Sequence, residues 1–393
     1  MNVARLCLAT LALFAAAAGA RDNVPGWISA GPFVDEPWIA IELPLEVFAT
    51  KLYVEVEIGG KPRRFVFDTG SPSMINAALA EELGLAVVDK RKGVDAHGTV
   101  VESDIVQADL TLGGTTFHKV PMFAADFSSS EAAQCLVGDG VLGSEVLPLC
   151  AWQIDLPESV LRCNSSLEQL NHVDGAAQQR LYDFGYPHAP IFDVRFAPDA
   201  RSKVLFDTGS PAYFTVSPPD FEGTQRAGGI GRTFPGSGSL GASLGGQAPS
   251  AAQLQAELKS LSIGGVDLGS VMAVRRELPP SLLGASILEH FVVTLDTRTE
   301  SAWFDQYREG PYARPSFGFS LAFDENIYVS LVWDDSPAAR AGLRVGQRLS
   351  ALNGIPTDAS CEGIRRALQA MSGETIALAW DGGAVTLKRE LTN

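Results

Sequence analysis

Two short segments of the sequence carry the same reactive side chains. FVFDTGSPS covers residues 65–73, and VLFDTGSPA recurs at residues 204–212. Two carboxyl groups held within hydrogen-bonding distance share one proton, so that one acts as a base toward water while the other acts as an acid. The pairing of Asp68 with Asp207 therefore predicts acid and base chemistry on a water nucleophile.

The residues that follow each Asp suit this chemistry. A Gly lets the backbone pass close to the opposite loop, and its N–H can donate to a carboxylate. The Thr hydroxyls can bond across from one loop to the other, while the Ser hydroxyls can bond the outer carboxylate oxygens. The expected supporting residues are Thr69, Gly70, Ser71, Thr208, Gly209 and Ser210.

Three further pairs of landmarks recur in the same order after each Asp. They are LTLGG and LSIGG, then GVLG and SLLG ending at Gly143 and Gly284, then WQID and VTLD ending at Asp155 and Asp296. Such self-similarity indicates a duplicated unit built from short alternating strands. A pseudo-two-fold axis between the copies would bring the two Asp loops together.

The chain therefore divides into lobes and a different C-terminal region. We expect a signal segment at 1–20, a first lobe at 21–165, a polar connector with some helical character at 166–188, a second lobe at 189–310, and a separate third domain at 316–393.

With the paired FDTGS motifs and the later VLG and LLG, the chain resembles the aspartic peptidases, specifically bacterial retropepsin-like enzymes with two lobes fused in one chain. The resemblance covers residues 38–307. It implies a mostly β, bilobal, pseudo-two-fold fold, with Asp68 and Asp207 as the catalytic dyad, an extended polypeptide as substrate, and no cofactor.

Members of this family cover the cleft with a hairpin called the flap. The candidate here is DAHGTVVES at 95–103, with His97, Gly98 and Thr99 at its turn. The matching Gly- and Ser-rich stretch of the second lobe, residues 228–247, reads either as a mobile flap or as a disordered loop. Pro72 and Pro211 depart from the family pattern and stiffen the exit from both Asp loops.

Residues 316–391 resemble a small α+β PDZ domain of the bacterial periplasmic-protease type, mainly through SPAARAGLRVGQRLSALNG at 336–354. The resemblance implies capture of an extended chain by strand addition. Phe317, Gly318 and Phe319 would form the loop that holds the carboxylate of a C-terminal peptide. The alternative is a domain that only packs against the lobes.

Cysteine and histidine positions bear on crosslinks and metals. CAWQIDLPESVLRC reads as a hairpin centred on Leu156-Pro157, which would place Cys150 directly opposite Cys163. Cys135 has no evident partner, and Cys361, in a different predicted domain, is expected to be free. The five histidines are scattered and no C-x-x-C occurs, so no metal site is predicted.

The N-terminal segment indicates where the protein is located, and the net charge disfavours two classes of partner. Residues 1–20 combine Arg5, an apolar run and small residues at the end, which is typical of a cleaved secretory signal and too short for a bilayer span. The net charge of -16 disfavours nucleic acid and anionic lipid. We expect an exported protein, periplasmic in a Gram-negative host or extracellular, without a stable membrane anchor.

Together these features predict an exported aspartic endopeptidase whose PDZ domain recruits or gates substrate. The alternative is a catalytically silent protein that binds or presents peptides with the same cleft and PDZ domain.

Overall fold

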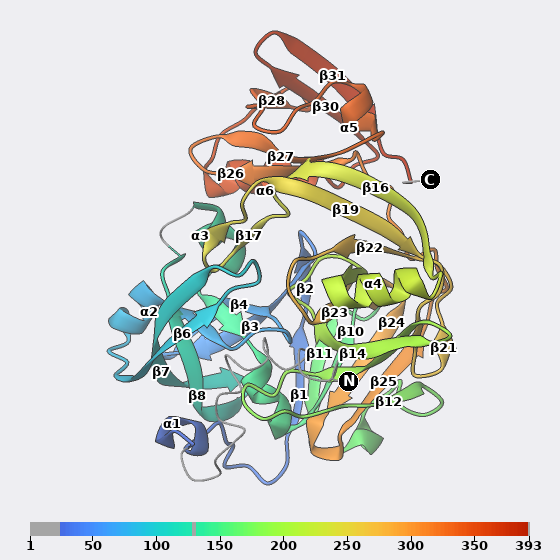
Figure 1. Cartoon of the computed structure of the whole chain (residues 1–393). Coiled ribbons are helices and arrows are strands. Elements are labelled where there is room, and N and C mark those ends of the chain that lie inside the picture. Colours follow the sequence, from blue (N-terminus) through green and yellow to red (C-terminus); the bar gives the residue numbers. More distant parts are fainter. Residues whose placement is uncertain (1–23, 128–130, 392–393) are drawn as a thin grey trace.

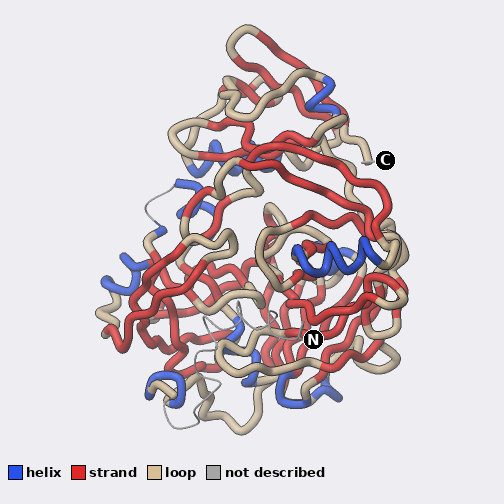
Figure 2. The backbone as a smooth tube through the Cα atoms, viewed as in Figure 1, coloured by secondary structure: helices blue, strands red, loops and turns tan. Residues whose placement is uncertain are grey.

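The computed structural model describes residues 24–127 and 131–391, and the signal segment predicted at 1–20 lies outside them. Strands dominate the described part, in two lobes with a smaller C-terminal domain above them (Figures 1 and 2). Gly-containing turns end several of the strands. Gly113-Gly114 and Gly264-Gly265, for example, all have positive φ and close the LTLGG and LSIGG hairpins.

The first lobe is built on an eight-stranded sheet, and one of its strands leads directly into the loop that carries Asp68. Its strands run in the order β2 (Glu46–Phe48), β3 (Lys51–Ile58), β4 (Lys61–Phe67), β9 (Gly140–Leu142), β5 (Met74–Asn76), β8 (Thr115–Ala125), β7 (Val100–Leu112) and β6 (Val87–Val94). Three helices accompany it: α1 (Gly26–Ser29), α2 (Ala77–Glu82) and α3 (Glu131–Val137). Strand β3 alternates buried and exposed residues, so one face packs into the core.

The second lobe repeats this arrangement within an eleven-stranded sheet. The order is β21 (Val266–Asp267), β20 (Ser262–Ile263), β13 (Ile191–Ala197), β14 (Ala200–Asp207), β23 (Ser281–Gly284), β15 (Phe214–Val216), β22 (Val271–Arg275), β19 (Ala251–Leu258), β16 (Ile230–Gly238), β27 (Ile327–Trp333) and β26 (Phe319–Phe323). Helix α4 (Pro218–Arg226) packs on it, and the short strands β17 (Ala242–Ser243) and β18 (Gly246–Gln247) pair with each other.

A six-stranded sheet joins the lobes. Its strands are β1 (Ala40–Pro44), β11 (Val160–Asn164), β10 (Ala151–Asp155), β24 (Phe291–Asp296), β25 (Ser301–Gln306) and β12 (Ala177–Arg180). Four 3-10 helices flank them: η3 (Ser144–Leu149), η4 (Leu167–Gln169), η5 (Ala285–Glu289) and η6 (Thr297–Thr299). The connector predicted at 166–188 contains the 3-10 helix η4 and the strand β12. Strand β12 pairs with β25 and forms one edge of this sheet.

The register of the first joining hairpin differs from the expectation. Cys163 lies opposite Trp152, not Cys150, because the turn is centred one residue later than Leu156-Pro157. A hydrogen bond from the N–H of Ser159 to the carbonyl of Leu156 closes that turn. Cys150 and Cys163 still form a disulfide, now between diagonal neighbours in adjacent strands.

The C-terminal domain has its own core but is not a separate body. A cluster that includes Phe317, Ile376 and Leu378 is buried within it. Its other elements are α5 (Pro337–Arg340), α6 (Cys361–Ala370) and a sheet in the order β29 (Ile355–Pro356), β28 (Ala351–Leu352), β30 (Thr375–Trp380) and β31 (Gly383–Lys388). Strand β27, however, pairs with β16 of the second lobe, so one sheet runs through both.

A second disulfide corrects the expectation that Cys361 is free. Cys361, at the start of α6, is bonded to Cys135 of α3, which joins the C-terminal domain to the first lobe. Sequence separation hid this pair, since the two cysteines lie 226 residues apart. Helices α3 and α6 pack against each other at the bond.

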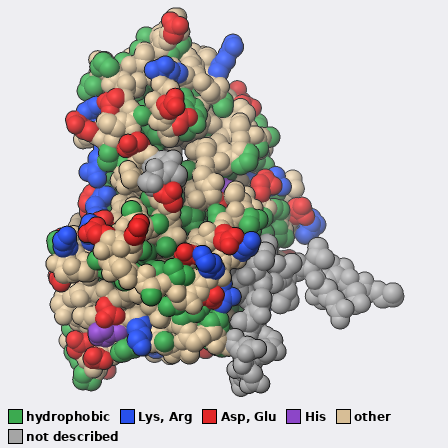
Figure 3. Space-filling model, turned by 90° about the vertical axis from the view of Figure 1, so that its left-hand side faces the viewer, with side chains coloured by type: hydrophobic (Ala, Val, Ile, Leu, Met, Phe, Trp, Pro, Cys, Tyr) green, Lys and Arg blue, Asp and Glu red, His purple; other side chains and the backbone are tan. Residues whose placement is uncertain are grey.

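The surface and the helices of the described part bear on the expected partners. Figure 3 shows acidic, basic and hydrophobic side chains interspersed over one face of the molecule. Among residues 24–127 and 131–391, no helix is long and apolar enough to cross a membrane.

Candidate active site

The two Asp loops meet where the lobes join. Strand β4 ends at Phe67 and runs parallel to β9, while β14 ends at Asp207 and runs parallel to β23. The glycines after these partner strands hold the loops from behind: a Cβ on Gly143 or Gly284 would lie 2.3 or 2.2 Å from loop backbone atoms. Each Asp therefore leaves the end of a buried strand into a braced turn.

Four hydrogen bonds cross between the loops. The N–H of Thr69 donates to Oγ1 of Thr208 over 3.0 Å, and the N–H of Thr208 donates to Oγ1 of Thr69 over 3.2 Å. The hydroxyl of Thr69 donates to the carbonyl of Phe206 over 2.7 Å, and the hydroxyl of Thr208 donates to the carbonyl of Phe67 over 2.9 Å. Both Thr side chains are fully buried, so this symmetric set fixes one Asp loop against the other.

The glycines of the triplets let the carboxyl groups approach the opposite backbone. A Cβ on Gly70 would lie 2.4 Å from Cγ of Asp207, and a Cβ on Gly209 would lie 2.2 Å from Oδ2 of Asp68. Their N–H groups also donate to the Asp of their own loop, at 3.0 Å for Gly70 and 2.9 Å for Gly209. A larger residue at either place would push the carboxyl groups apart.

The serines behave differently from the expectation. Ser210 reaches Asp207 through its backbone N–H, at 3.1 Å. The hydroxyl of Ser71 is buried without a hydrogen-bond partner, so the predicted bond to the outer oxygen of Asp68 is wrong. The backbone of Ser71 is instead fixed by Ser144, which donates to the Ser71 carbonyl from its N–H and its hydroxyl.

Burial and a neighbouring negative charge change the pKa of one member of the Asp pair. Desolvation, followed by the charge of Asp68 and a hydrogen bond with it, raises the pKa of Asp207 to about 7. The positive charge of Arg276 and the N–H of Gly209 act in the opposite direction. Burial and the neighbouring charge therefore favour one proton held by the pair.

A second buried carboxyl group supports the first Asp loop. Glu145 is fully buried, and burial raises its pKa to about 7. One of its oxygens accepts the N–H of Ser73 over 2.7 Å, and the other accepts the hydroxyl of Tyr186 over 2.9 Å. Sequence reasoning missed it, although a Glu two residues after Gly143, where the second copy has Ser286, is a signal that was available.

The predicted flap residues lie at the turn between β6 and β7, in residues 95–99. Oδ1 of Asp95 accepts the N–H groups of His97 and Thr99 at 3.0 and 2.8 Å, which shapes the turn. Oδ2 of Asp95 accepts the N–H of Gly245 over 3.0 Å, and the N–H of Ala96 donates to Ser243. The first-lobe flap thus touches the tip of the second-lobe hairpin.

That second-lobe stretch forms a paired hairpin in the structure, and its role as a flap stays a prediction. It consists of β16 and β19 with a tip at residues 239–250, and Figure 1 shows it as two long ribbons beneath the C-terminal domain. Gly236 faces Trp333 so closely that a Cβ there would lie 2.5 Å from the indole. The N–H of Ser239 donates to Ser330, and that of Asp334 donates to Pro235. The C-terminal domain is therefore attached directly to this hairpin.

The predicted carboxylate loop is folded into its own domain. Phe317 and Phe319 are buried, and their ring centroids lie 6.2 Å apart. Gly318 has a positive φ and fits closely against Ser336. The carbonyls of Phe317 and Gly318 accept the N–H groups of Ala338 and Trp333. This geometry fixes the shape of the loop.

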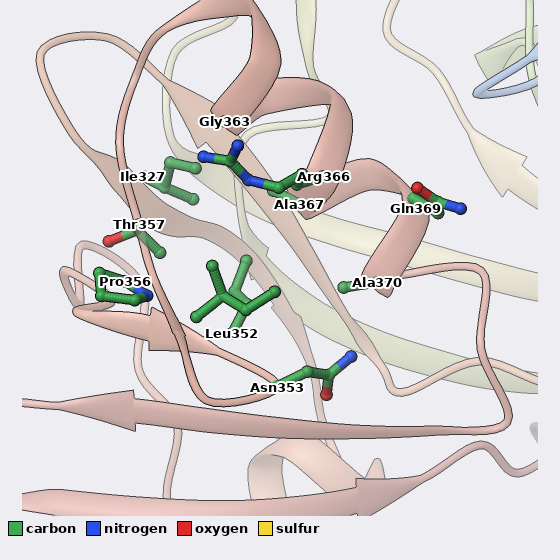
Figure 4. A pocket seen from close by; sticks show the side chains of 11 residues that line it. Ile327, Leu352, Asn353, Pro356, Thr357, Gly363, Arg366, Ala367, Gln369 and Ala370 are labelled. Atoms are coloured by element: carbon green, nitrogen blue, oxygen red, sulfur yellow. The ribbon is translucent and has the colours of Figure 1, made fainter.

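A hollow of about 340 Å³ lies elsewhere in this domain, between α6 and the β28–β29 hairpin (Figure 4). Its apolar lining includes Ile327, Leu352 and Ala367. The guanidinium of Arg366 lies beside it and is held by Glu362 and Asp358. None of the loop residues 317–319 lines the hollow, so it is distinct from the predicted carboxylate site.

Comparisons with known proteins agree with this architecture. Residues 54–146 match the family model of the aspartyl proteases, and residues 328–381 match that of the PDZ domain. The chain thus carries an aspartyl protease match and a PDZ domain match over these residues, as its sequence predicts, and the prediction of a mostly β fold with a small PDZ domain is confirmed. No curated protein matches the chain.

The solved structures similar to this chain include the aspartic proteinase from Irpex lacteus, at 12% sequence identity and a TM-score of 0.41. The similarity covers 68% of this chain and 97% of that chain. The family match includes Asp68 and Gly143 but ends before Asp207. The role of Asp207 is therefore argued from the repeat and from the geometry above.

Proposed function

We propose that this protein is an exported aspartic endopeptidase that cleaves extended polypeptides. One observation carries the proposal: two Asp-Thr-Gly-Ser loops face each other and are fixed by reciprocal hydrogen bonds between Thr69 and Thr208. A merely structural turn would not need an identical copy across a pseudo-two-fold axis. The signal segment and the periplasmic or extracellular location remain part of the proposal.

The electrostatics suggest how the two carboxyl groups would divide the work. Asp207, with its raised pKa, would hold the shared proton, and Asp68 would take a proton from water. The water oxygen would attack the peptide carbonyl carbon while Asp207 protonates the carbonyl oxygen. In the tetrahedral intermediate, Asp68 would give the proton that it took from water to the amide nitrogen, and Asp207 would take a proton back from one of the two hydroxyl groups. The C–N bond would then break, which releases the amine and the carboxylic acid and leaves the shared proton on Asp207.

Cleavage of end-capped peptides by the purified protein tests this proposal. Asp68→Asn and Asp207→Asn should each lower kcat about 10³-fold or more, because each removes one partner of the proton exchange. Both variants keep the size of the side chain, so thermal unfolding serves as the folding control. Peptide binding without cleavage by the folded wild type would support the alternative, a catalytically silent peptide-binding protein.

We further propose that the PDZ domain gates the cleft, since its strand β27 extends the sheet of the second-lobe flap. Gly236→Val should separate β16 from Trp333, raise hydrogen exchange across residues 230–258 and change kcat/KM. The matched control is Gly231→Val on the same strand, where the nearest group is the flexible end of Glu257. Equal exchange and kinetics in both variants would argue that the domain only packs or recruits.

A further inference from the structure

A loop of the second lobe places a cationic side chain beside the dyad. Residues 276–280 join β22 to β23, and β23 pairs with β14 so that Gly284 lies opposite Asp207. The N–H of Arg276 donates to the carbonyl of Val216 over 3.0 Å. Its Nη1 donates to the carbonyl of Pro280 over 2.9 Å, so the side chain runs along its own loop.

The first-lobe flap lies over this loop. A Cβ on Gly98, at the flap turn, would lie 3.4 Å from Cδ1 of Leu278. Burial lowers the pKa of His97 on that turn, with the charge of Asp95 acting against this effect and the charge of Arg276 adding to it. The charge of Arg276 also acts to lower the pKa of Asp207. The loop of Arg276 therefore contacts the first-lobe turn and leads into the strand that pairs beside Asp207.

Arg276 makes no close ion pair among the described residues, although the charge of Asp207 acts to raise its pKa. No carboxylate oxygen there lies within 4.0 Å of its guanidinium, and its Nη1 donates to the backbone carbonyl of Pro280. The carboxylate next in sequence, Glu277, is exposed and lies nearest Arg275, at 3.9 Å. Arg276 is half-buried, and this burial lowers its pKa. A cation that is partly removed from water gains from a closely paired carboxylate.

We propose that Arg276 is a specificity-determining residue that binds a carboxylate of the substrate, so that the cleft favours peptides with Asp or Glu next to the scissile bond. The inference rests on the proposed function. A guanidinium matches a carboxylate with two parallel N–H donors, and Arg276 uses only Nη1 within its loop. Because the whole chain is acidic, long-range attraction would not favour such peptides, and the selection would arise in the cleft.

The test is a set of end-capped peptides in which one Glu is moved through the four positions on each side of the cleavage site, with Gln in its place in the matched peptide. For the wild type we expect kcat/KM to be about 10- to 100-fold higher for Glu at one position. Arg276→Gln should bring that ratio close to one, and Arg276→Lys should leave an intermediate ratio. Arg275→Gln, the adjacent control, should keep the wild-type ratio.

Three results would overturn the inference. First, the wild type could cleave Glu and Gln peptides with nearly equal kcat/KM at every position. This result requires no variant and therefore no folding control. Arg276→Gln could lower the rates for Glu and Gln peptides equally, which would indicate support of the loop. If uncapped Gln peptides are added to the set, a preference could also appear only for their free C-terminal carboxylate, which would assign Arg276 to chain ends and not to side chains.

A binding measurement separates failure of this inference from failure of the proposed function. Calorimetry with the Asp68→Asn variant compares the best Glu peptide with its Gln partner without any cleavage. Tighter binding of Glu, lost on adding Arg276→Gln, would support the inference even if the wild type cleaves nothing. Equal binding of both peptides would overturn it in the same circumstance.

Discussion

Two buried carboxyl groups, Asp207 and Glu145, have raised pKa values of about 7 for different reasons. Asp207 shares its site with Asp68, so burial and a neighbouring negative charge act together. Glu145 is raised by burial, against hydrogen bonds from Ser73 and Tyr186 that favour its charged form. The first group belongs to the proposed chemistry, and the second braces the chain that leaves Asp68.

The titration of Asp207 predicts the alkaline limit of activity. Because its pKa is raised to about 7, the shared proton is lost as pH rises through that value. The proposed acid then disappears, so kcat/KM should fall about tenfold for each pH unit above 7. A pH profile from 4 to 9 measures this limb. Activity that stays constant to pH 9 would contradict the assignment of Asp207 as the proton holder.

The titration of Glu145 predicts the pH dependence of stability. Its pKa is raised above the ordinary value of 4.5 to about 7, so the folded state binds this proton more tightly than the unfolded state. The stabilisation is complete below pH 4.5 and is lost as pH rises through 7. The free energy of unfolding should fall by about 3 kcal/mol over this interval.

Denaturant unfolding of Asp207→Asn with and without Glu145→Gln isolates this effect, since Asp207 titrates in the same range. The Glu145→Gln substitution should flatten the remaining slope. It should also leave the alkaline limb of activity in place when made in the wild type, because Asp207 is unchanged. A slope that survives Glu145→Gln would assign it to another group.

The sequence predicted the site residues that are repeated in both motif copies, but not the site residues that occur once. Asp68, Asp207 and the two Thr residues were predictable because each has a copy at the same place in a motif. Glu145 and Arg276 have no copy, and their roles depend on which loops the fold brings near them. The bond expected for the Ser71 hydroxyl rested on its chemistry alone, whereas the backbone carbonyl of Ser71 is held by Ser144 in a contact that no pattern encodes.

At the scale of elements, the flap contact between Asp95 and Gly245 predicts a kinetic effect. Asp95→Asn keeps an oxygen for the turn amides but loses the acceptor for the N–H of Gly245. We expect about a tenfold change in KM with kcat nearly unchanged, since only the closed flap is weakened. Asp95→Ala, which removes the turn bonds as well, is the comparison. Equal kinetics for wild type and Asp95→Asn would show that this bond does not hold the flap closed.

Element types were predictable here, but registers and partners were not. The strand pattern indicates the hairpin of residues 150–163, yet one extra residue before its turn moves Cys150 off the position opposite Cys163. The pairing of β16 with β27 was also hidden. A sequence pattern can indicate a strand whose backbone N–H and C=O groups are free to pair. Which other strand it pairs with depends on the packed fold.

At the scale of the whole molecule, the Cys135–Cys361 bond predicts a selective response to reductant. Cys150 and Cys163 are fully buried, whereas Cys361 is partly exposed. Mild reduction of the native protein should therefore release only Cys135 and Cys361, as identified by alkylation and mass spectrometry. The double variant Cys135→Ser/Cys361→Ser should lose about 2–4 kcal/mol of stability, because the bond closes a long loop. Labelling of Cys150 and Cys163 first would contradict this order.

The same bond has a consequence for a nicked protein. Every residue from 136 to 360 lies between the two bonded cysteines, so a single break of the backbone in that span would leave both pieces joined through sulfur. The two-chain product would migrate as one species on a gel without reductant and as two species with it. A preparation that looks intact by size can therefore already be a heterodimer of its own fragments.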